Sequence, residues 1–145
     1  MNSPSVNHQV PRAAAIVGLA GVALIHLLEL QTKFQEVPYL GMGYVLLIVA
    51  SVVAGALLVH SNSRAGWVIG GGAALGALLG YSMTRTIGLP QSSGDIGNWL
   101  EPIGLTSLFV EASVAALAGY AMATFSPAIS KMTADRRRSI LPIAR

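Results

Sequence analysis

The chain contains no cysteine among its 145 residues. Disulfide bonds, thiolate metal sites and a cysteine nucleophile are therefore excluded. Charged residues are nearly as scarce, at 10% of the chain, whereas a soluble domain usually carries about 25%. Hydrophobic residues make up 53% and gather in long runs. This composition predicts helices that face lipid, in one membrane domain without a water-soluble domain beside it.

Familiar catalytic motifs are also missing, since the sequence shows no Gly-rich phosphate loop, nucleophile elbow or zincin motif. The net charge is +3. The basic residues nevertheless lie at the ends of apolar runs and form no stripe with interleaved aromatic side chains, so nucleic acid is not an expected partner. The pattern leans away from an enzyme and gives no sign of a cofactor.

Four apolar runs approach or exceed the length of about 20 residues that a helix needs to cross a bilayer. The predicted spans are 13–30, 39–59, 65–83 and 102–124. A disordered lead at 1–12 precedes the membrane domain, residues 13–125, and a basic tail follows at 126–145. The expected fold is an all-α transmembrane four-helix bundle.

Lys and Arg are distributed unevenly between the two sides of this bundle. The lead, the turn at 60–64 and the tail together hold seven of the nine basic residues, and the other two loops hold only Lys33 and Arg85. Because cytoplasmic loops carry the excess of Lys and Arg, we expect both termini in the cytoplasm. This pattern predicts a multi-pass protein of the inner membrane with the loop at 86–98 outside.

The tail contains a run of three arginines, Arg136, Arg137 and Arg138. Such a run can bind anionic lipid at about 1 kcal/mol for each basic residue near the surface. A role in fixing the topology would explain these arginines equally well.

Small residues recur at spacing four in spans three and four. Transmembrane helices associate through close backbone approach, which favours small residues at this spacing. The predicted packing positions are Gly72, Gly76, Gly80, Ala115 and Gly119. The row in span four begins at Glu111, and a similar row in span one ends at His26, so we expect these polar side chains to point inward. The alternative is that such rows arise by chance in a chain rich in Ala and Gly.

Glu111 lies about nine positions into span four, which places it about 14 Å below the outer boundary and close to the midplane. Ionisable groups at this depth usually pair with another group or mark a pathway. His26 or Tyr81 is the expected partner, because Arg85 lies near the surface. The alternative is a purely structural glutamic acid that is hydrogen-bonded to a neighbouring helix.

His26 and Glu29 share one face of span one at spacing three. A dinuclear metal site in a four-helix bundle would need two such pairs and further glutamates, and only one pair exists. The other histidines lie outside the span interiors, so a bis-histidine haem is also poorly placed. We therefore expect no metal and interpret His26 as a hydrogen-bonded core residue.

Arg85 stands at the outer end of span three, where it can reach Glu29 or Glu101. The two interpretations are an ion pair between helix ends and a site for an anion. Glu101 also fits the third helical position after an N-cap at Asn98. The candidate polar pocket consists of His26, Glu29, Tyr81, Arg85, Glu101 and Glu111.

The segments TRTIGLP (84–90) and NWLEPIGLTSLFVE (98–111), with the H-x-x-E pair at His26 and Glu29, resemble those of small uncharacterised four-span membrane proteins of bacteria. The resemblance implies four spans and residence in the inner membrane, and it implies no activity.

Two functions remain open from the sequence. The first is a structural or accessory subunit of an inner-membrane complex, whose partners are the lipid bilayer and other membrane subunits or a second copy. The alternative is a small oligomeric transporter or proton-linked carrier that uses the polar pocket. An enzyme or redox protein that binds haem or quinone has the least support.

Overall fold

The computed structural model describes the backbone of residues 9–140 and the side chains of residues 9–125, and it consists of four α-helices. The helices are α1 (Gln9–Glu36), α2 (Pro38–His60), α3 (Arg64–Thr86) and α4 (Pro102–Ile140). All four are long and apolar enough to cross a membrane, α4 over Pro102–Phe125. The prediction of an all-α fold with four membrane-spanning helices is therefore confirmed at the level of length and composition.

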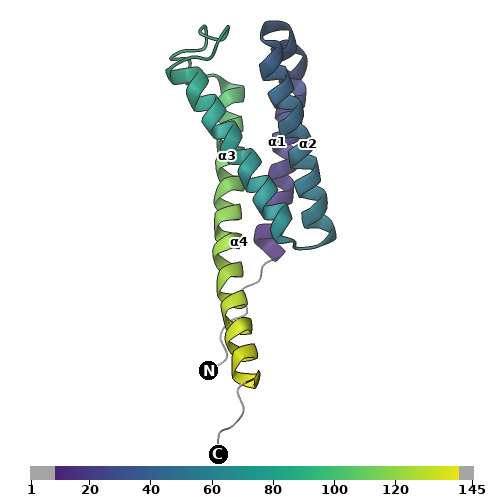
Figure 1. Ribbon diagram of the computed structural model, residues 1–145. Coiled ribbons are helices and arrows are strands. Elements are labelled where there is room, and N and C mark those ends of the chain that lie inside the picture. The colour runs from purple at the N-terminus through teal and green to yellow at the C-terminus, as the bar shows by residue number, and fades with distance from the viewer. Residues whose placement is uncertain (1–8, 141–145) are drawn as a thin grey trace, which may run out of the picture.

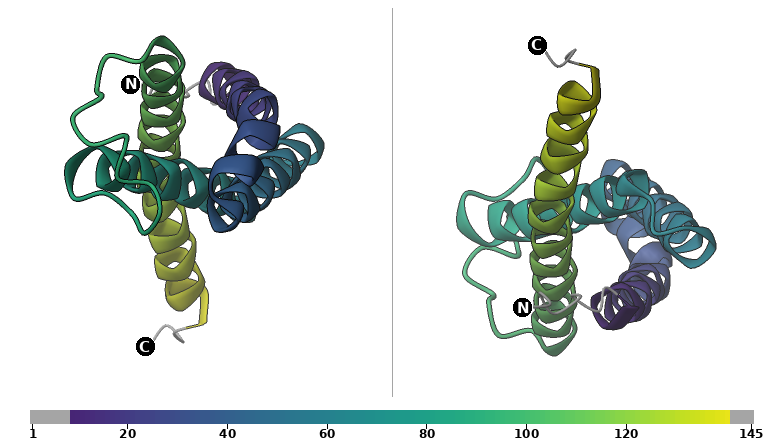
Figure 2. Two further views of the ribbon diagram at one scale, coloured as in Figure 1. Left: turned by 90° about the horizontal axis from the view of Figure 1, so that it is seen from above. Right: turned by 90° about the horizontal axis from the view of Figure 1, so that it is seen from below.

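The helices run up and down and pack mainly as neighbours in a ring, α1 on α2, α2 on α3, α3 on α4 and α4 on α1 (Figures 1 and 2). One end of the bundle carries the α1–α2 connection and the long loop 87–101, and we call it the loop end. The opposite end carries the start of α1 and the turn 61–63. The pair α1 and α2 diverges from the pair α3 and α4 toward the loop end (Figure 1).

Proline and serine set three of the helix starts. Pro38 begins α2, and Ser63 caps α3 by accepting a hydrogen bond from the Gly66 amide at 3.1 Å. Pro102 is the first residue of α4. The predicted N-cap at Asn98 with Glu101 in the third helical position is therefore wrong. A residue that precedes proline avoids the helical region, so the helix cannot start upstream of Glu101, whose carbonyl accepts the Leu105 amide at 2.9 Å.

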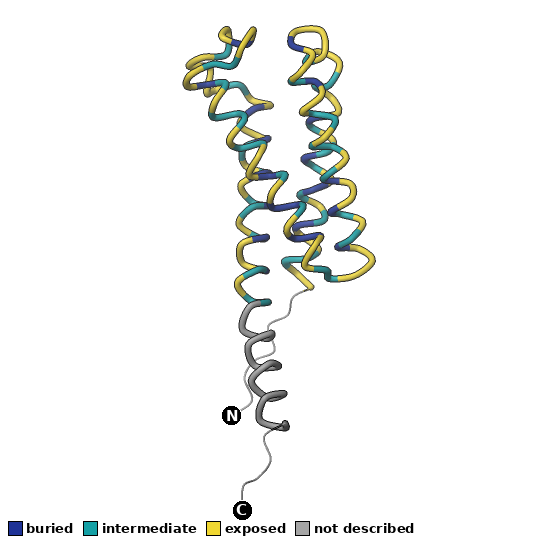
Figure 3. Tube along the Cα trace, in the orientation of Figure 1, coloured by how far each residue is buried: buried dark blue, intermediate teal, exposed yellow. Residues whose placement is uncertain are grey.

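The packed core fills the half of the bundle away from the loop end (Figure 3). Leu19, Val22, Leu58, Trp67 and Val114 are all at most 3% exposed there. In lipid such a core is held by close packing of the helices rather than by escape from water. The helices consequently meet tightly at this end.

The glycines at which the helices meet are not the predicted ones. A Cβ at Gly71 would stand 2.7 Å from the Cβ of Ala118, whereas one at Gly72, Gly76, Gly80 or Gly119 would meet no described atom within 4 Å. The prediction of packing at these four positions is therefore wrong within this chain. Successive residues are about 100° apart around a helix, so Gly72 faces away from the contact that Gly71 makes. Ala115 does pack against the core.

Part of the predicted disordered lead is helical. Gln9–Arg12 form the first turn of α1, and Arg12 donates hydrogen bonds to the carbonyls of Leu58 at 2.5 Å and Val59 at 2.7 Å. The rest of the lead, residues 1–8, lies outside the described residues. The side chains of Arg136, Arg137 and Arg138 also lie outside the described part of the chain.

Candidate functional site

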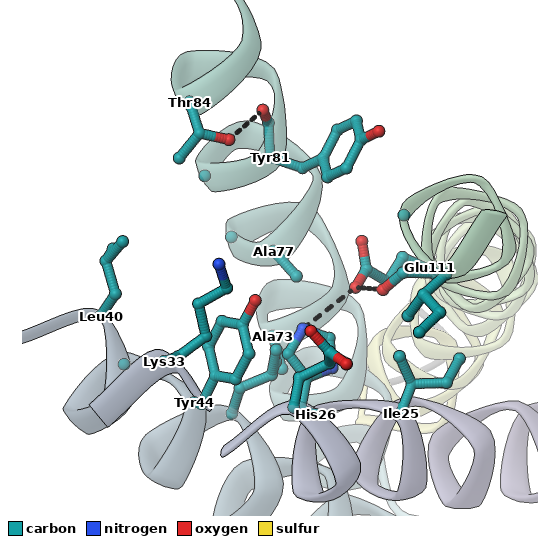
Figure 4. A pocket seen from close by; sticks show the side chains of 18 of the residues that line it. Ile25, His26, Lys33, Leu40, Tyr44, Ala73, Ala77, Tyr81, Thr84 and Glu111 are labelled. Carbon is teal, nitrogen blue, oxygen red and sulfur yellow. Dashed lines mark hydrogen bonds and ion pairs between the residues drawn. The ribbon is translucent and has the colours of Figure 1, made fainter. Parts of the chain in front are cut away.

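A cavity of about 420 Å³ lies between the helices on the loop side of the core (Figure 4). It extends from Ala73 and Glu111, next to the core, to Leu89 and Asp95 in the loop 87–101. All six residues of the predicted polar pocket line this one cavity: His26, Glu29, Tyr81, Arg85, Glu101 and Glu111. The structure thus brings together side chains from α1, α3 and α4 and from the residue that precedes α4.

Glu111 forms the inner end of the cavity and is 1% exposed. Ser107, one turn earlier on α4, donates a hydrogen bond to its Oε1 at 2.6 Å. The Nε2 atom of His26 lies 3.6 Å from the same oxygen. The other oxygen, Oε2, is buried and has no hydrogen-bond partner among the described residues. The carboxyl group is therefore held by one oxygen only.

His26 is oriented by its own helix and by α2. Its Nδ1 lies 2.9 Å from the Val22 carbonyl. A carbonyl oxygen can only accept, so Nδ1 carries a proton and Nε2 is the nitrogen that faces Glu111. The Tyr44 ring packs edge-on against the imidazole, with ring centroids 4.6 Å apart. Figure 4 shows the side chains of His26, Tyr44 and Glu111 meeting from α1, α2 and α4.

The chemistry of this pair depends on one proton. The separation of 3.6 Å is longer than a hydrogen bond, so either a neutral imidazole lies beside a protonated Glu111 or an imidazolium forms an ion pair with the carboxylate. Both arrangements leave the pair without net charge, which suits a site enclosed by helices. Of the two predicted partners of Glu111, His26 and Tyr81, the structure selects His26. Tyr81 instead donates to the Trp99 carbonyl at 3.4 Å.

Arg85 lies at the mouth of the cavity and is 6% exposed. Its guanidinium contacts Asp95 Oδ2 at 3.0 Å and Glu101 Oε2 at 2.6 Å. It also lies over the Tyr81 ring, 4.7 Å from the centroid. Of the two predicted ion-pair partners the structure selects Glu101. The anion-site interpretation loses support, because two carboxylates already occupy the guanidinium.

The same arginine anchors the long loop. Its backbone carbonyl accepts the Gly97 amide at 2.9 Å, and Gly97 has a φ of +80°, a conformation that glycine adopts without strain. On the other side of the mouth, Tyr39 of α2 donates to the Pro90 carbonyl at 2.6 Å. The loop 87–101 is therefore attached both to α3 and to α2.

Five further polar residues of the cavity were not among the predicted site residues: Lys33, Tyr44, Thr84, Asp95 and Ser107. Ser107 could have been found, because it stands four residues before Glu111 and so shares its helix face. Tyr44 carried no such signal, since a tyrosine near the start of a span is typical of the interface. Lys33 forms an ion pair with Glu36 at 2.6 Å.

Metal ligands do not cluster in the described part of the chain. Residues 9–125 contain no group of three or more His, Cys, Asp or Glu side chains placed to hold one metal ion. The two polar centres of the cavity are thus the pair of His26 and Glu111 and the ion-pair network of Arg85.

Comparisons of the chain with known protein families, with curated proteins and with solved structures found no match.

Proposed function

We propose that this chain is a small carrier of the inner membrane that takes a small molecule into the cavity between its helices. Both termini lie in the cytoplasm, and the cavity opens outward, as the distribution of Lys and Arg predicts. The observation that carries the proposal is the cavity itself, which ends at a buried carboxyl group with one free oxygen.

The size and lining of the cavity support binding of a ligand. Small-molecule sites usually measure about 300–1,000 Å³ and combine an apolar wall with a few placed polar groups. Here the apolar wall includes Ile25, Leu47, Ala73 and Ala77, and the polar groups stand at the inner end and at the mouth. Such a cavity suits an amphipathic molecule better than a fully polar one.

The cavity has no continuation through the packed core, where Leu19, Leu58 and Trp67 are nearly unexposed. Transport across the bilayer therefore requires a rearrangement that opens the other end. Carriers usually achieve this by moving one repeat or bundle against another. Four spans supply only one bundle, so the proposed carrier works as an oligomer.

The pair of His26 and Glu111 gives such a carrier a place to hold a proton near the middle of the membrane. Intramembrane acids and histidines often serve as proton relays. We therefore include coupling to protons in the proposal. A neutral pair and a bound substrate would share the same inner end of the cavity.

Filling the cavity provides the test. Gly76 lines the cavity, and Gly55 on α2 does not, while a Cβ at either position would meet no described atom within 4 Å. Small molecules extracted from the protein purified in mild detergent should be lost from Gly76→Leu and retained by Gly55→Leu. Mass spectrometry of the extracts measures this difference. Equal extracts from both folded variants would contradict the proposal.

A second candidate function is an accessory subunit of a larger membrane complex. Gly72 and Gly119 are exposed and free of contacts within the described chain, so another helix can approach the backbone there. Gly72→Leu and Gly119→Leu should then remove a partner protein from the mild-detergent preparation, whereas Gly76→Leu should keep it. The two candidates thus predict opposite outcomes for Gly76→Leu and Gly72→Leu.

A further inference from the structure

Carboxylates outnumber cations around the cavity. Its lining includes two cations, Lys33 and Arg85, and four acids, Glu29, Asp95, Glu101 and Glu111. Arg85 is paired with Asp95 and Glu101, and Lys33 with Glu36, which is not part of the lining. Among the described side chains, this leaves Glu29 without a cation and Glu111 with His26 alone.

The free oxygen of Glu111 is a second, independent observation. Buried polar atoms almost always have a hydrogen-bond partner, yet Oε2 of this 1% exposed residue has none among the described residues. Figure 4 shows the carboxyl group extending from α4 toward His26, below Tyr81. An oxygen in this position can accept a hydrogen bond from a donor in the cavity.

The surroundings of this oxygen suit an organic donor. A metal ion would require about four to eight ligands, and residues 9–125 present no group of three. Tyr44 supplies an aromatic ring to the lining, and aromatic faces attract organic cations. The apolar wall of Ile25, Leu47 and Ala73 offers a surface for hydrocarbon.

We propose that the cavity binds a lipophilic organic ammonium ion. Its N–H group donates to Glu111 Oε2, and its positive charge takes the place of the proton that the pair of His26 and Glu111 otherwise holds, so that Glu111 binds it as a carboxylate beside a neutral His26. Glu29 adds a second negative charge, and the hydrocarbon part of the ligand lies along the apolar wall. This inference rests on the proposed function and names the class of molecule that the cavity takes. It assigns Glu111 as the ligand-binding acid and Glu29 as the second source of negative charge.

Three probes of one shape test the inference: 4-phenylbutylamine, which is protonated at neutral pH, the neutral 4-phenylbutan-1-ol, and 4-phenylbutyrate. Isothermal titration of the full chain in lipid nanodiscs measures their binding. We expect the amine to bind at least tenfold more tightly than the alcohol. Glu111→Gln should abolish this preference because it removes the negative charge, and a circular-dichroism spectrum like that of the wild type shows that the variant is folded. Glu29→Gln should weaken amine binding severalfold.

The possible outcomes distinguish a failure of the ammonium inference from a failure of the proposed function. Equal binding of the amine and the alcohol, or a preference for the carboxylate, overturns the ammonium inference and leaves a binding cavity. A preference for the amine that persists in Glu111→Gln also overturns the inference. Failure of all three probes to bind the wild-type chain overturns the inference, and the proposed function falls with it only if Gly76→Leu and Gly55→Leu also yield equal extracts.

Discussion

The Nε2 atom of His26 on α1 lies 3.6 Å from Oε1 of Glu111 on α4. This contact joins the first helix of the bundle to the last at the level where the packed core ends and the cavity begins. Ser107 holds the same oxygen from within α4. The inner end of the cavity is therefore built from both sides of the α1–α4 contact.

A double-mutant cycle measures how strongly this contact stabilises the bundle. His26→Phe keeps a ring against Tyr44 and removes Nε2, while Glu111→Gln keeps the shape of the acid. Groups in contact typically couple by about 0.5–3 kcal/mol, and hydrogen bonds inside membranes average about 0.6 kcal/mol. We expect a coupling of about 1 kcal/mol in the free energy of unfolding in detergent. The control combines His26→Phe with Ser113→Ala. Because the Ser113 hydroxyl bonds only the Phe109 carbonyl, the effects of these two changes on the free energy of unfolding should add. If the effects of His26→Phe and Glu111→Gln on the free energy of unfolding also simply added, this would contradict the contact between the two residues.

Arg85 should control the order of the loop 87–101. Hydrogen bonds to a charged group are worth about 1.5–3 kcal/mol, but Asp95 and Glu101 keep 30% and 37% of their side chains exposed. We therefore expect Arg85→Gln to cost about 1–2 kcal/mol, most of it as local opening of the loop. Hydrogen exchange should quicken across 87–101 and stay unchanged at the 61–63 turn. Arg64→Gln, at an exposed arginine at the other end of α3, is the control. Unaltered exchange in the loop of Arg85→Gln would show that the ion pairs do not hold it.

The four helices could be predicted because apolar length is a direct requirement of crossing a bilayer. The sequence predicted that Glu111 has a partner, since buried acids in membranes need one, but it left His26 and Tyr81 open, and the structure selects His26. Hydropathy could not tell which glycine meets a neighbouring helix, because lipid and helix surfaces are equally apolar. Gly71 and Gly72 are indistinguishable by hydropathy. They differ only in the side of α3 on which they lie, and the packing of α3 on α4 decides which side makes the contact.

Two local signals compete at the start of α4, which the predicted span from 102 places correctly and the predicted N-cap at Asn98 does not. Asn98 with Glu101 three residues later is typical of a capped helix start, but Pro102 restricts the residue before it. The restriction imposed by Pro102 decides the outcome, so α4 begins at Pro102 and Glu101 remains outside the helix, where it reaches Arg85. The choice of Glu101 over Glu29 depends on the path of the loop, which no spacing in the sequence encodes.

The proposed orientation predicts which loop is reached from outside the cell. Because the chain has no cysteine, a single introduced thiol reports on one position. Ser93 and Ser61 are both exposed, one in the long loop and one in the turn at the opposite end. In intact cells a membrane-impermeant maleimide should label Ser93→Cys, and it should label Ser61→Cys only after permeabilisation. The reverse pattern would place both termini outside.

Neighbouring glycines on α3 give the sharpest test of how the bundle packs. Gly71→Ala would put a methyl group 2.7 Å from the Cβ of Ala118, an atom that no rotamer change can move, so α3 and α4 must separate. Overpacking of this kind costs about 1–3 kcal/mol. Gly72→Ala meets no described atom within 4 Å, and alanine favours a helix over glycine by about 1 kcal/mol. The unfolding temperature in detergent should therefore fall for Gly71→Ala and rise or stay level for Gly72→Ala. If Gly72→Ala were the more damaging change, α3 would have to be rotated by about one residue, which would also turn Gly76 away from the position that the cavity test requires.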